Sequence, residues 1–141
     1  MSMRALDGKV PLVRDDPQTW ALVASDERRD IRETVVEGFG ITYTWFRIKS
    51  RLPLGNHYHK DKTEVFCLKN GSGKFYLQPL AFVNGRMVAN GTWIVIDMVI
   101  GTDLTIAPFT AHMVILEPGS EMVCLSTKPF DQADMIPWKL A

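Results

Sequence analysis

The sequence lacks an excess of charge of either sign. Sixteen lysines and arginines balance sixteen aspartates and glutamates, and neither sign forms a long block. Proteins that bind the phosphate backbone of nucleic acids normally carry a basic excess. We therefore do not expect nucleic acid as a partner, although the balance allows a local cationic pocket for one small phosphorylated metabolite.

Cysteine and long apolar segments are also scarce. The two cysteines, Cys67 and Cys124, each lie inside an apolar run, and a pair does not make a disulfide framework. We expect both to be packing residues. The first six residues do not form the apolar stretch of a signal peptide. No run approaches the ~20 apolar residues that cross a bilayer, so we expect a cytoplasmic protein that contacts no membrane.

Short β-type runs separated by turn residues are abundant. Asn84-Gly85, between two apolar triplets, is typical of a tight hairpin because it supplies the positive φ angles of a type I′ turn. Residues 19–34 fit either one helix or a strand at 20–23 followed by a charged turn at 26–29, and we favour the strand. The runs rich in β-branched and aromatic residues are 41–48, 63–68, 74–77, 93–98, 103–106, 112–117 and 122–127.

This pattern predicts an all-β barrel or sandwich, because it has at least eight strands, short turns and no long helix. A chain of 141 residues fits one domain with its own core. We divide it into N-terminal strands at 1–40, a barrel at 41–128 and an irregular tail at 129–141.

The chain has three histidines, and their placement is the most informative feature of the sequence. His57 and His59 are two residues apart, so on a strand both side chains point to one face. Glu64 follows on the same face as large apolar side chains, where a buried carboxylate needs a cation or hydrogen-bond donors. His112 starts another apolar run. If both runs line one barrel, three imidazoles and a carboxylate converge.

Such a set is a candidate site for one divalent transition metal. Neutral imidazole and carboxylate suit zinc, iron, manganese, nickel or copper, and the residues do not choose among them. We expect the metal ligands to be His57, His59, Glu64 and His112.

The same residues carry a resemblance to a known family. Gly55-Asn56-His57-Tyr58-His59, followed by Glu64 and then Gly71, resembles the first motif of the cupin superfamily. Gly101, Pro108 and His112 resemble the second motif, with Thr110 in place of a usual glycine and Leu116 in place of a usual asparagine. The resemblance implies a double-stranded β-helix, the RmlC-like jelly-roll barrel, with the four residues above as its metal ligands.

The first motif and the nearby lysine and threonine also resemble the cupin domain of bacterial capsular-polysaccharide biosynthesis enzymes. These enzymes act on nucleotide-linked 4-keto-6-deoxy sugars. The resemblance implies a metal-assisted isomerase or epimerase for a keto sugar or sugar nucleotide. The alternatives are a cupin dioxygenase for a small diol or diketone and a non-catalytic cupin that binds a small ligand in its barrel.

Isomerisation requires a general base close to the substrate proton. Because no fourth histidine exists, the candidates are Glu64 itself, a tyrosine, another carboxylate or a metal-bound hydroxide. Tyr43, Tyr76 and Asp97 lie on runs that could face the cavity, and we take Glu64 and Tyr76 as candidate catalytic residues. No other cofactor is expected.

The segment before residue 41 is longer than a minimal barrel needs. Extra strands in such barrels often pair with a neighbouring subunit, which covers exposed sheet edges. We therefore expect a symmetric homodimer.

Overall fold

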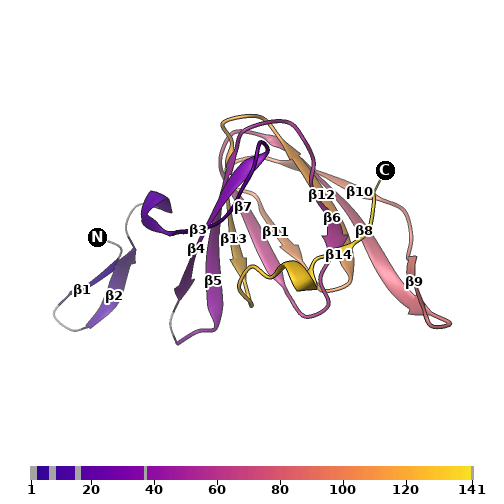
Figure 1. Cartoon of the computed structure of the whole chain (residues 1–141), viewed down its shortest axis with the longest axis horizontal. Helices are drawn as coiled ribbons and strands as arrows, with labels where there is room; N and C mark the ends of the chain where they lie inside the picture. The colour runs from indigo at the N-terminus through magenta and orange to yellow at the C-terminus, as the bar shows by residue number, and fades with distance from the viewer. Residues whose placement is uncertain (1–2, 7–8, 15–16, 37, 141) are drawn as a thin grey trace.

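The computed structural model describes residues 3–6, 9–14, 17–36 and 38–140, and almost every regular element in these ranges is a β-strand (Figure 1). Two short 3₁₀ helices, η1 (Pro17–Thr19) and η2 (Gln132–Asp134), interrupt the strands. Neither helix has the length and apolar content to cross a membrane. The strands are β1 (Met3–Leu6), β2 (Lys9–Arg14), β3 (Ala21–Ser25), β4 (Arg29–Val36), β5 (Ile41–Ile48), β6 (Leu54–Tyr58), β7 (Glu64–Asn70), β8 (Gly73–Val83), β9 (Arg86–Ala89), β10 (Ile94–Met98), β11 (Asp103–Ile106), β12 (Thr110–Leu116), β13 (Glu121–Ser126) and β14 (Ile136–Pro137).

Most of the described strands belong to two antiparallel sheets that curl toward each other. One has the order β10-β8-β12-β6-β14, with β9 paired to β8, and the other has the order β11-β7-β13-β5-β4-β3. Neighbours in each sheet are often distant in sequence, as β6 and β12 are, which is the crossover pattern of a jelly roll. The predicted jelly-roll barrel is confirmed. Strands β1 and β2 form a separate hairpin that stands apart from the two sheets in Figure 1.

Side chains from the inner faces of both sheets fill the barrel. The main hydrophobic cluster includes Phe66 and Leu68 of β7, Phe75 and Leu77 of β8, and Met122 of β13. Each strand contributes alternate residues, as expected for a sheet with one face on the core. Burial of one such side chain stabilises the fold by about 1.5–3 kcal/mol.

The strand boundaries confirm most of the predicted runs and correct three details. The hairpin at Asn84-Gly85 is present, and both residues have positive φ, 51° and 75°. The ambiguous segment before residue 26 forms β3, as favoured. However, β8 continues past the predicted run through Pro79, which lies where pairing with β12 ends. Residues 54–56, which lie outside the predicted runs, begin β6. The tail contains η2 and β14, so it is less irregular than expected.

Close approach of two strands at Gly55 sets the spacing of the candidate site. Gly55 on β6 has φ +97°, and a Cβ there would lie 2.6 Å from the carbonyl oxygen of His112 on β12. The pairing register shifts between His112 and Met113 at this point. A side chain at Gly55 would push β12 away from β6, and with it the two histidines that face each other across the pair.

We expect Gly55→Ala to destabilise the protein by about 1–3 kcal/mol more than Gly119→Ala, because overpacking adds to the cost of positive φ. Gly119 is the matched control, since it has φ +85° but nothing within 4 Å of an added Cβ. Urea denaturation of both metal-free variants measures the difference. Equal losses of stability would show that the β6–β12 approach is not tight.

Candidate metal centre

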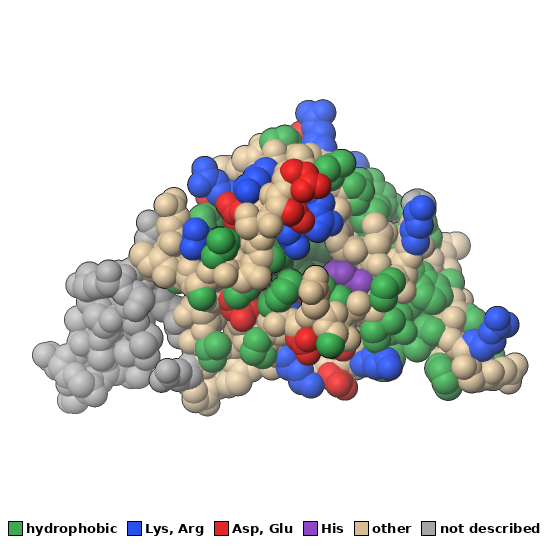
Figure 2. Space-filling view, viewed as in Figure 1, with side chains coloured by type: hydrophobic (Ala, Val, Ile, Leu, Met, Phe, Trp, Pro, Cys, Tyr) green, Lys and Arg blue, Asp and Glu red, His purple; other side chains and the backbone are tan. Residues whose placement is uncertain are grey.

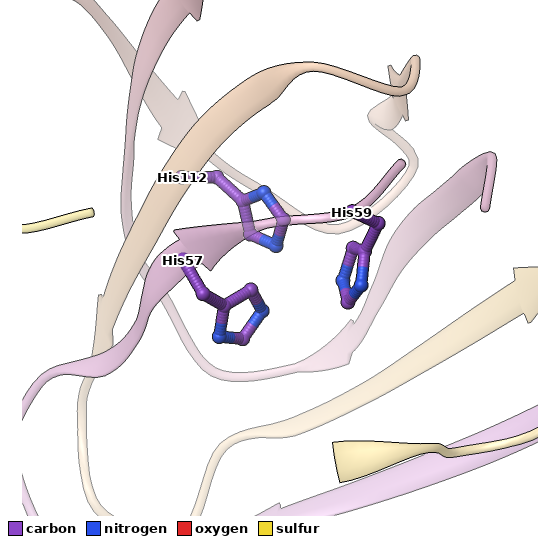
Figure 3. Close-up of side chains that lie close together, drawn as sticks. All are labelled: His57, His59 and His112. Atoms are coloured by element: carbon purple, nitrogen blue, oxygen red, sulfur yellow. The ribbon is translucent and has the colours of Figure 1, made fainter. Parts of the chain in front are cut away.

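The three histidines come together on the inner side of the sheet that contains β6 and β12 (Figure 3). His57 lies on β6 and is paired in register with His112 on β12. His59 follows one residue after β6 ends. One ring nitrogen from each histidine lies within 4.8 Å of those of the other two, and the set could hold a metal ion.

Glu64, the first residue of β7, brings a carboxylate to the same point from the other sheet. Its Oε1 lies 3.2 Å from Nε2 of His59 and 3.5 Å from Nε2 of His112. The side chains of Glu64, His59 and His112 are all buried. All four predicted ligands therefore line one cavity, with the carboxylate of Glu64 beside His59 and His112.

Backbone carbonyl groups fix the orientation of two of the imidazoles. Nδ1 of His59 lies 2.9 Å from the carbonyl oxygen of Asp134, and Nδ1 of His112 lies 3.0 Å from that of Thr110. A carbonyl oxygen accepts hydrogen bonds and cannot donate them, so each Nδ1 carries the proton. Each Nε2 then presents a lone pair toward Glu64. Because the contact uses the backbone of Thr110, it does not depend on the glycine usual at that position.

These lone pairs and a carboxylate oxygen are acceptors that face one another. Within the described part of the chain, Nε2 of His59 and Oε1 of Glu64 are buried and have no hydrogen-bond partner. Buried acceptors at 3.2 Å repel each other unless a cation lies between them. A metal ion meets this requirement, and its imidazole ligands typically donate the other ring N–H to a carbonyl or carboxylate, as they do here.

The size of the cluster also fits a metal ion. Metal–nitrogen bonds of about 2.0–2.1 Å place three ligand atoms on one ion about 3.4–3.6 Å apart in tetrahedral or trigonal geometry. The nitrogen atoms of the three histidines lie within 4.8 Å of one another, so the widest pair closes by at most a little over an ångström, which side-chain rotation supplies.

The second oxygen of Glu64 has different neighbours. Oε2 accepts a hydrogen bond from the thiol of Cys124 at 3.7 Å and lies 3.8 Å from Nζ of Lys62. Burial raises the pKa of the Cys124 thiol well above its usual value, so the thiol keeps its proton. The thiol and the ammonium hold one side of the carboxylate, and the other side remains turned toward the imidazoles.

A cavity of about 190 Å³ opens onto this cluster. Histidine atoms are visible from outside in Figure 2. The wall of the cavity deep in the barrel is apolar and includes Phe66, Phe75 and Met122. Other parts of the cavity lining are cationic and consist of Arg28, Arg29 and Lys62. Asp26 forms ion pairs with Arg28 and Arg29, each at 2.8 Å.

Lys62 was not found by reasoning from the sequence. It lies in the spacer between the histidine pair and Glu64, where a lysine is usually solvated. In the structure its side chain is only 7% exposed and turns into the cavity. The only signal in the sequence is its position two residues before Glu64, which on an extended chain gives both side chains the same direction.

The candidate bases other than Glu64 do not reach the site. Tyr76 lies on the face of β8 opposite Phe75 and Leu77, and its ring centroid is 6.2 Å from that of Trp93. Its position contradicts the expected catalytic role. Asp97 forms an exposed ion pair with Lys74, and Tyr43 packs near Trp20. None of the three is among the cavity-lining residues.

The cysteines differ from each other. Cys124 is buried beside Glu64, whereas Cys67 is partly exposed and donates a hydrogen bond to Asp103 at 2.8 Å. Burial and this carboxylate raise the pKa of Cys67 to about 11. Both thiols therefore stay protonated at neutral pH, and neither is a reactive nucleophile.

Solved structures with a similar chain fold include three proteins of known name. The capsular polysaccharide assembling protein CapF from Staphylococcus aureus matches 86% of the chain with a TM-score of 0.64 and 21% identity, over 35% of its own length. Oxalate decarboxylase from Bacillus subtilis matches 94% with a TM-score of 0.68 and 17% identity, over 33% of its length. The QdtA 3,4-ketoisomerase from Thermoanaerobacterium thermosaccharolyticum matches 68% with a TM-score of 0.53 and 21% identity, over 63% of its length.

The chain has the cupin fold. It spans about a third of the length of CapF and of oxalate decarboxylase. No protein-family model matches the sequence, and no curated protein matches it either. The resemblance of the histidine motifs to the cupin superfamily is thus confirmed at the level of the fold.

The tail after β13 closes this cupin barrel beside the histidines. β14 pairs with β6 at His57 and Tyr58, and Phe130, Gln132 and Met135 line the cavity. The same segment provides the Asp134 carbonyl group that orients His59. The tail is therefore part of the site.

The stability of the metal-free protein should fall as the pH drops from about 6.5 toward 3. Burial, and then the neighbouring imidazoles of His112 and His59, lower the pKa of His57 from 6.5 to about 3. The unfolded chain binds this proton at a higher pH than the folded chain does, so acid favours unfolding. Urea denaturation from pH 7 to pH 4 should show a smaller slope for His57→Gln. Identical slopes would mean that His57 is not desolvated.

Proposed function

We propose that this cupin is a metal-dependent isomerase or epimerase that acts on a keto sugar or sugar nucleotide. His57, His59, Glu64 and His112 hold one divalent ion. The observation that carries the proposal is the buried contact between Oε1 of Glu64 and Nε2 of His59, two atoms without a hydrogen-bond partner, in a cavity with cationic lining.

A bound ion at this site would supply Lewis acidity, which polarises a substrate carbonyl and acidifies the adjacent C–H bond. The protein residues would orient the ligands of the ion and stabilise charge on the substrate. The carbonyl groups of Asp134 and Thr110 keep the two Nε2 lone pairs aimed at the site. The ammonium of Lys62 places a fixed positive charge beside it, which stabilises negative charge that develops on a substrate oxygen.

Proton transfer is assigned to Glu64. Among the described residues that line the cavity, the proton acceptors at neutral pH are the three imidazoles and this carboxylate. Two of the imidazoles already have fixed tautomers directed at the centre of the site. The Oε2 oxygen of Glu64, beside Lys62 and Cys124, is the atom placed to take a proton from the cavity side.

The size and charge of the cavity support a sugar as the reacting part of the substrate. A volume of about 190 Å³ holds on the order of a dozen water-sized groups, which is comparable to one monosaccharide ring. A nucleotide would have to remain outside, near Arg28 and Arg29. Two of the structural neighbours support this substrate class: CapF is a capsular polysaccharide assembling protein, and the QdtA 3,4-ketoisomerase was solved with TDP.

A second candidate is a cupin dioxygenase for a small diol or diketone. The aromatic wall beside the histidines favours it, because the Phe66 ring centroid lies 6.3 Å from that of His112 and 4.9 Å from that of Phe75. Such a wall suits a less polar substrate. Oxygen consumption on diols or diketones by the iron- or manganese-loaded protein, without deuterium exchange into keto sugars, would favour the dioxygenase.

The purified wild-type protein should contain about one first-row metal ion per chain, and the His57→Ala/Glu64→Ala double variant should contain none. Plasma mass spectrometry measures the ion, and NMR measures deuterium uptake from solvent into a nucleotide-linked keto sugar. Metal without exchange or oxygen consumption would leave a ligand-binding cupin. Absence of metal, even after reconstitution, would refute the site.

Lys62→Met should reduce the exchange rate by about 10²–10³-fold, the usual cost of losing one group that stabilises a developing oxyanion. Metal content should remain at the wild-type level. Lys60→Met is the matched control, because Lys60 is exposed and lies two residues earlier. Equal rates for the two variants would show that the buried ammonium has no part in the reaction.

A further inference from the structure

The sheet β10-β8-β12-β6-β14 is apolar on both of its faces. Phe75 and Leu77 of β8 belong to the cluster inside the barrel, whereas Tyr76 and Leu80 belong to a second cluster outside it. We call this outer side, with its second cluster, the outer apolar face. Its buried members are Tyr58, Leu80, Ala111, Met113 and Leu140, and its half-buried members are Tyr76, Met87, Ile115, Ile136 and Trp138.

The tail covers only one end of the outer apolar face. Trp138 packs on Tyr58, with ring centroids 6.3 Å apart. Leu140 is buried, and its backbone N–H donates a hydrogen bond to the side chain of Asn56. The part over β8, β9 and β10 remains open, and Figure 2 shows hydrophobic side chains gathered on that side of the molecule. The exposed large side chains there are Phe82 (70%), Val95 (52%), Trp93 (42%) and Phe109 (40%).

The exposed apolar area is close to what one side of a stable dimer requires. With about 200 Å² for a whole aromatic side chain and somewhat less for valine, these four residues expose about 400 Å². A standard interface buries about 800 Å² per partner, of which about 450 Å² is apolar. The half-buried members of the cluster add to the total. A patch of this size is comparable to the largest one on a typical monomer, which is often functional.

The charge of the outer apolar face favours a second copy of the same chain. Among the outward-facing residues of β8, β9, β10 and β12, the charged ones are Lys74 and Asp97, which form an ion pair at 2.6 Å. A face without net charge meets its own copy without repulsion between like charges. Its content of tryptophan, tyrosine, phenylalanine and methionine is typical of an interface core.

We propose that the outer apolar face is the interface of a homodimer, in which two copies stack their β10-β8-β12-β6-β14 sheets about a two-fold axis. Face-to-face packing of two sheets about 10 Å apart buries the side chains of both. The β8–β9 hairpin extends past the end of β12 (Figure 1), so Phe82 can pack on the partner. The sequence had indicated a dimer through the segment before residue 41, and the structure points to the opposite sheet.

Sedimentation equilibrium of the full chain at micromolar concentration tests the interface. We expect a mass of about 32 kDa, twice the 15.9 kDa of one chain. Val95→Lys and Phe82→Lys should each weaken the dimer by at least about tenfold, because each buries an unpaired charge at the interface. Both positions are exposed in the single chain, so both variants should fold as monomers, which circular dichroism and thermal melting check.

Val23→Lys is the control, because Val23 is a 37% exposed valine on β3 at the far edge of the other sheet. It should leave the dimer intact. A wild-type monomer would overturn the proposal, as would a dimer that resists both the Val95 and Phe82 changes. A dimer lost only with Val23→Lys would place the interface at the N-terminal strands and would equally overturn it.

Discussion

The buried contact between the Glu64 carboxylate and the Nε2 lone pairs of His59 and His112 is the constraint on which the site depends. Two groups of acceptors at this distance repel each other in a low-dielectric interior unless a proton or a metal ion lies between them. Each is nevertheless held in place: the imidazoles by carbonyl groups on the far side of each ring, and the carboxylate by Cys124 and Lys62. Strands from both sheets and the C-terminal tail all contribute, so the barrel as a whole positions the acceptors. A metal ion bound between these atoms would relieve the repulsion among them.

The sequence predicts this convergence because strands have a period of two. That period places His57 and His59 on one face and Glu64 on the face of Phe66, and the structure agrees. The prediction fails at Tyr76, since β8 has large apolar residues at consecutive positions and alternation then does not tell the inner face from the outer one. It fails at Lys62 for a different reason. Whether a long side chain in a loop turns inward depends on a partner from another strand, here Glu64, and no local pattern reports such a contact.

The ambiguity at β8 and the proposed dimer have the same origin. A sheet with water on one side would have a polar residue between Phe75 and Leu77, and the sequence would then distinguish its inner face. Tyr76 instead places a large apolar ring on the outer face, as expected if a second copy covers that face. The two faces are also close to each other on β6, where Tyr58 points outward between His57 and His59. Packing on the outer side therefore restrains the backbone that carries two of the proposed ligands.

The cupin fold alone does not determine the reaction, because one scaffold can host many chemistries. The groups that discriminate lie around the histidines. The aromatic wall limits the depth and polarity of the cavity, whereas Lys62, Arg28 and Arg29 make its lining cationic. Asp26 neutralises part of that charge at the arginines, whereas Lys62 is paired with Glu64. Once Glu64 shares its charge with a bound cation, the ammonium of Lys62 has less to balance it. This cationic lining is the reason that the proposed substrate is oxygen-rich and negatively charged.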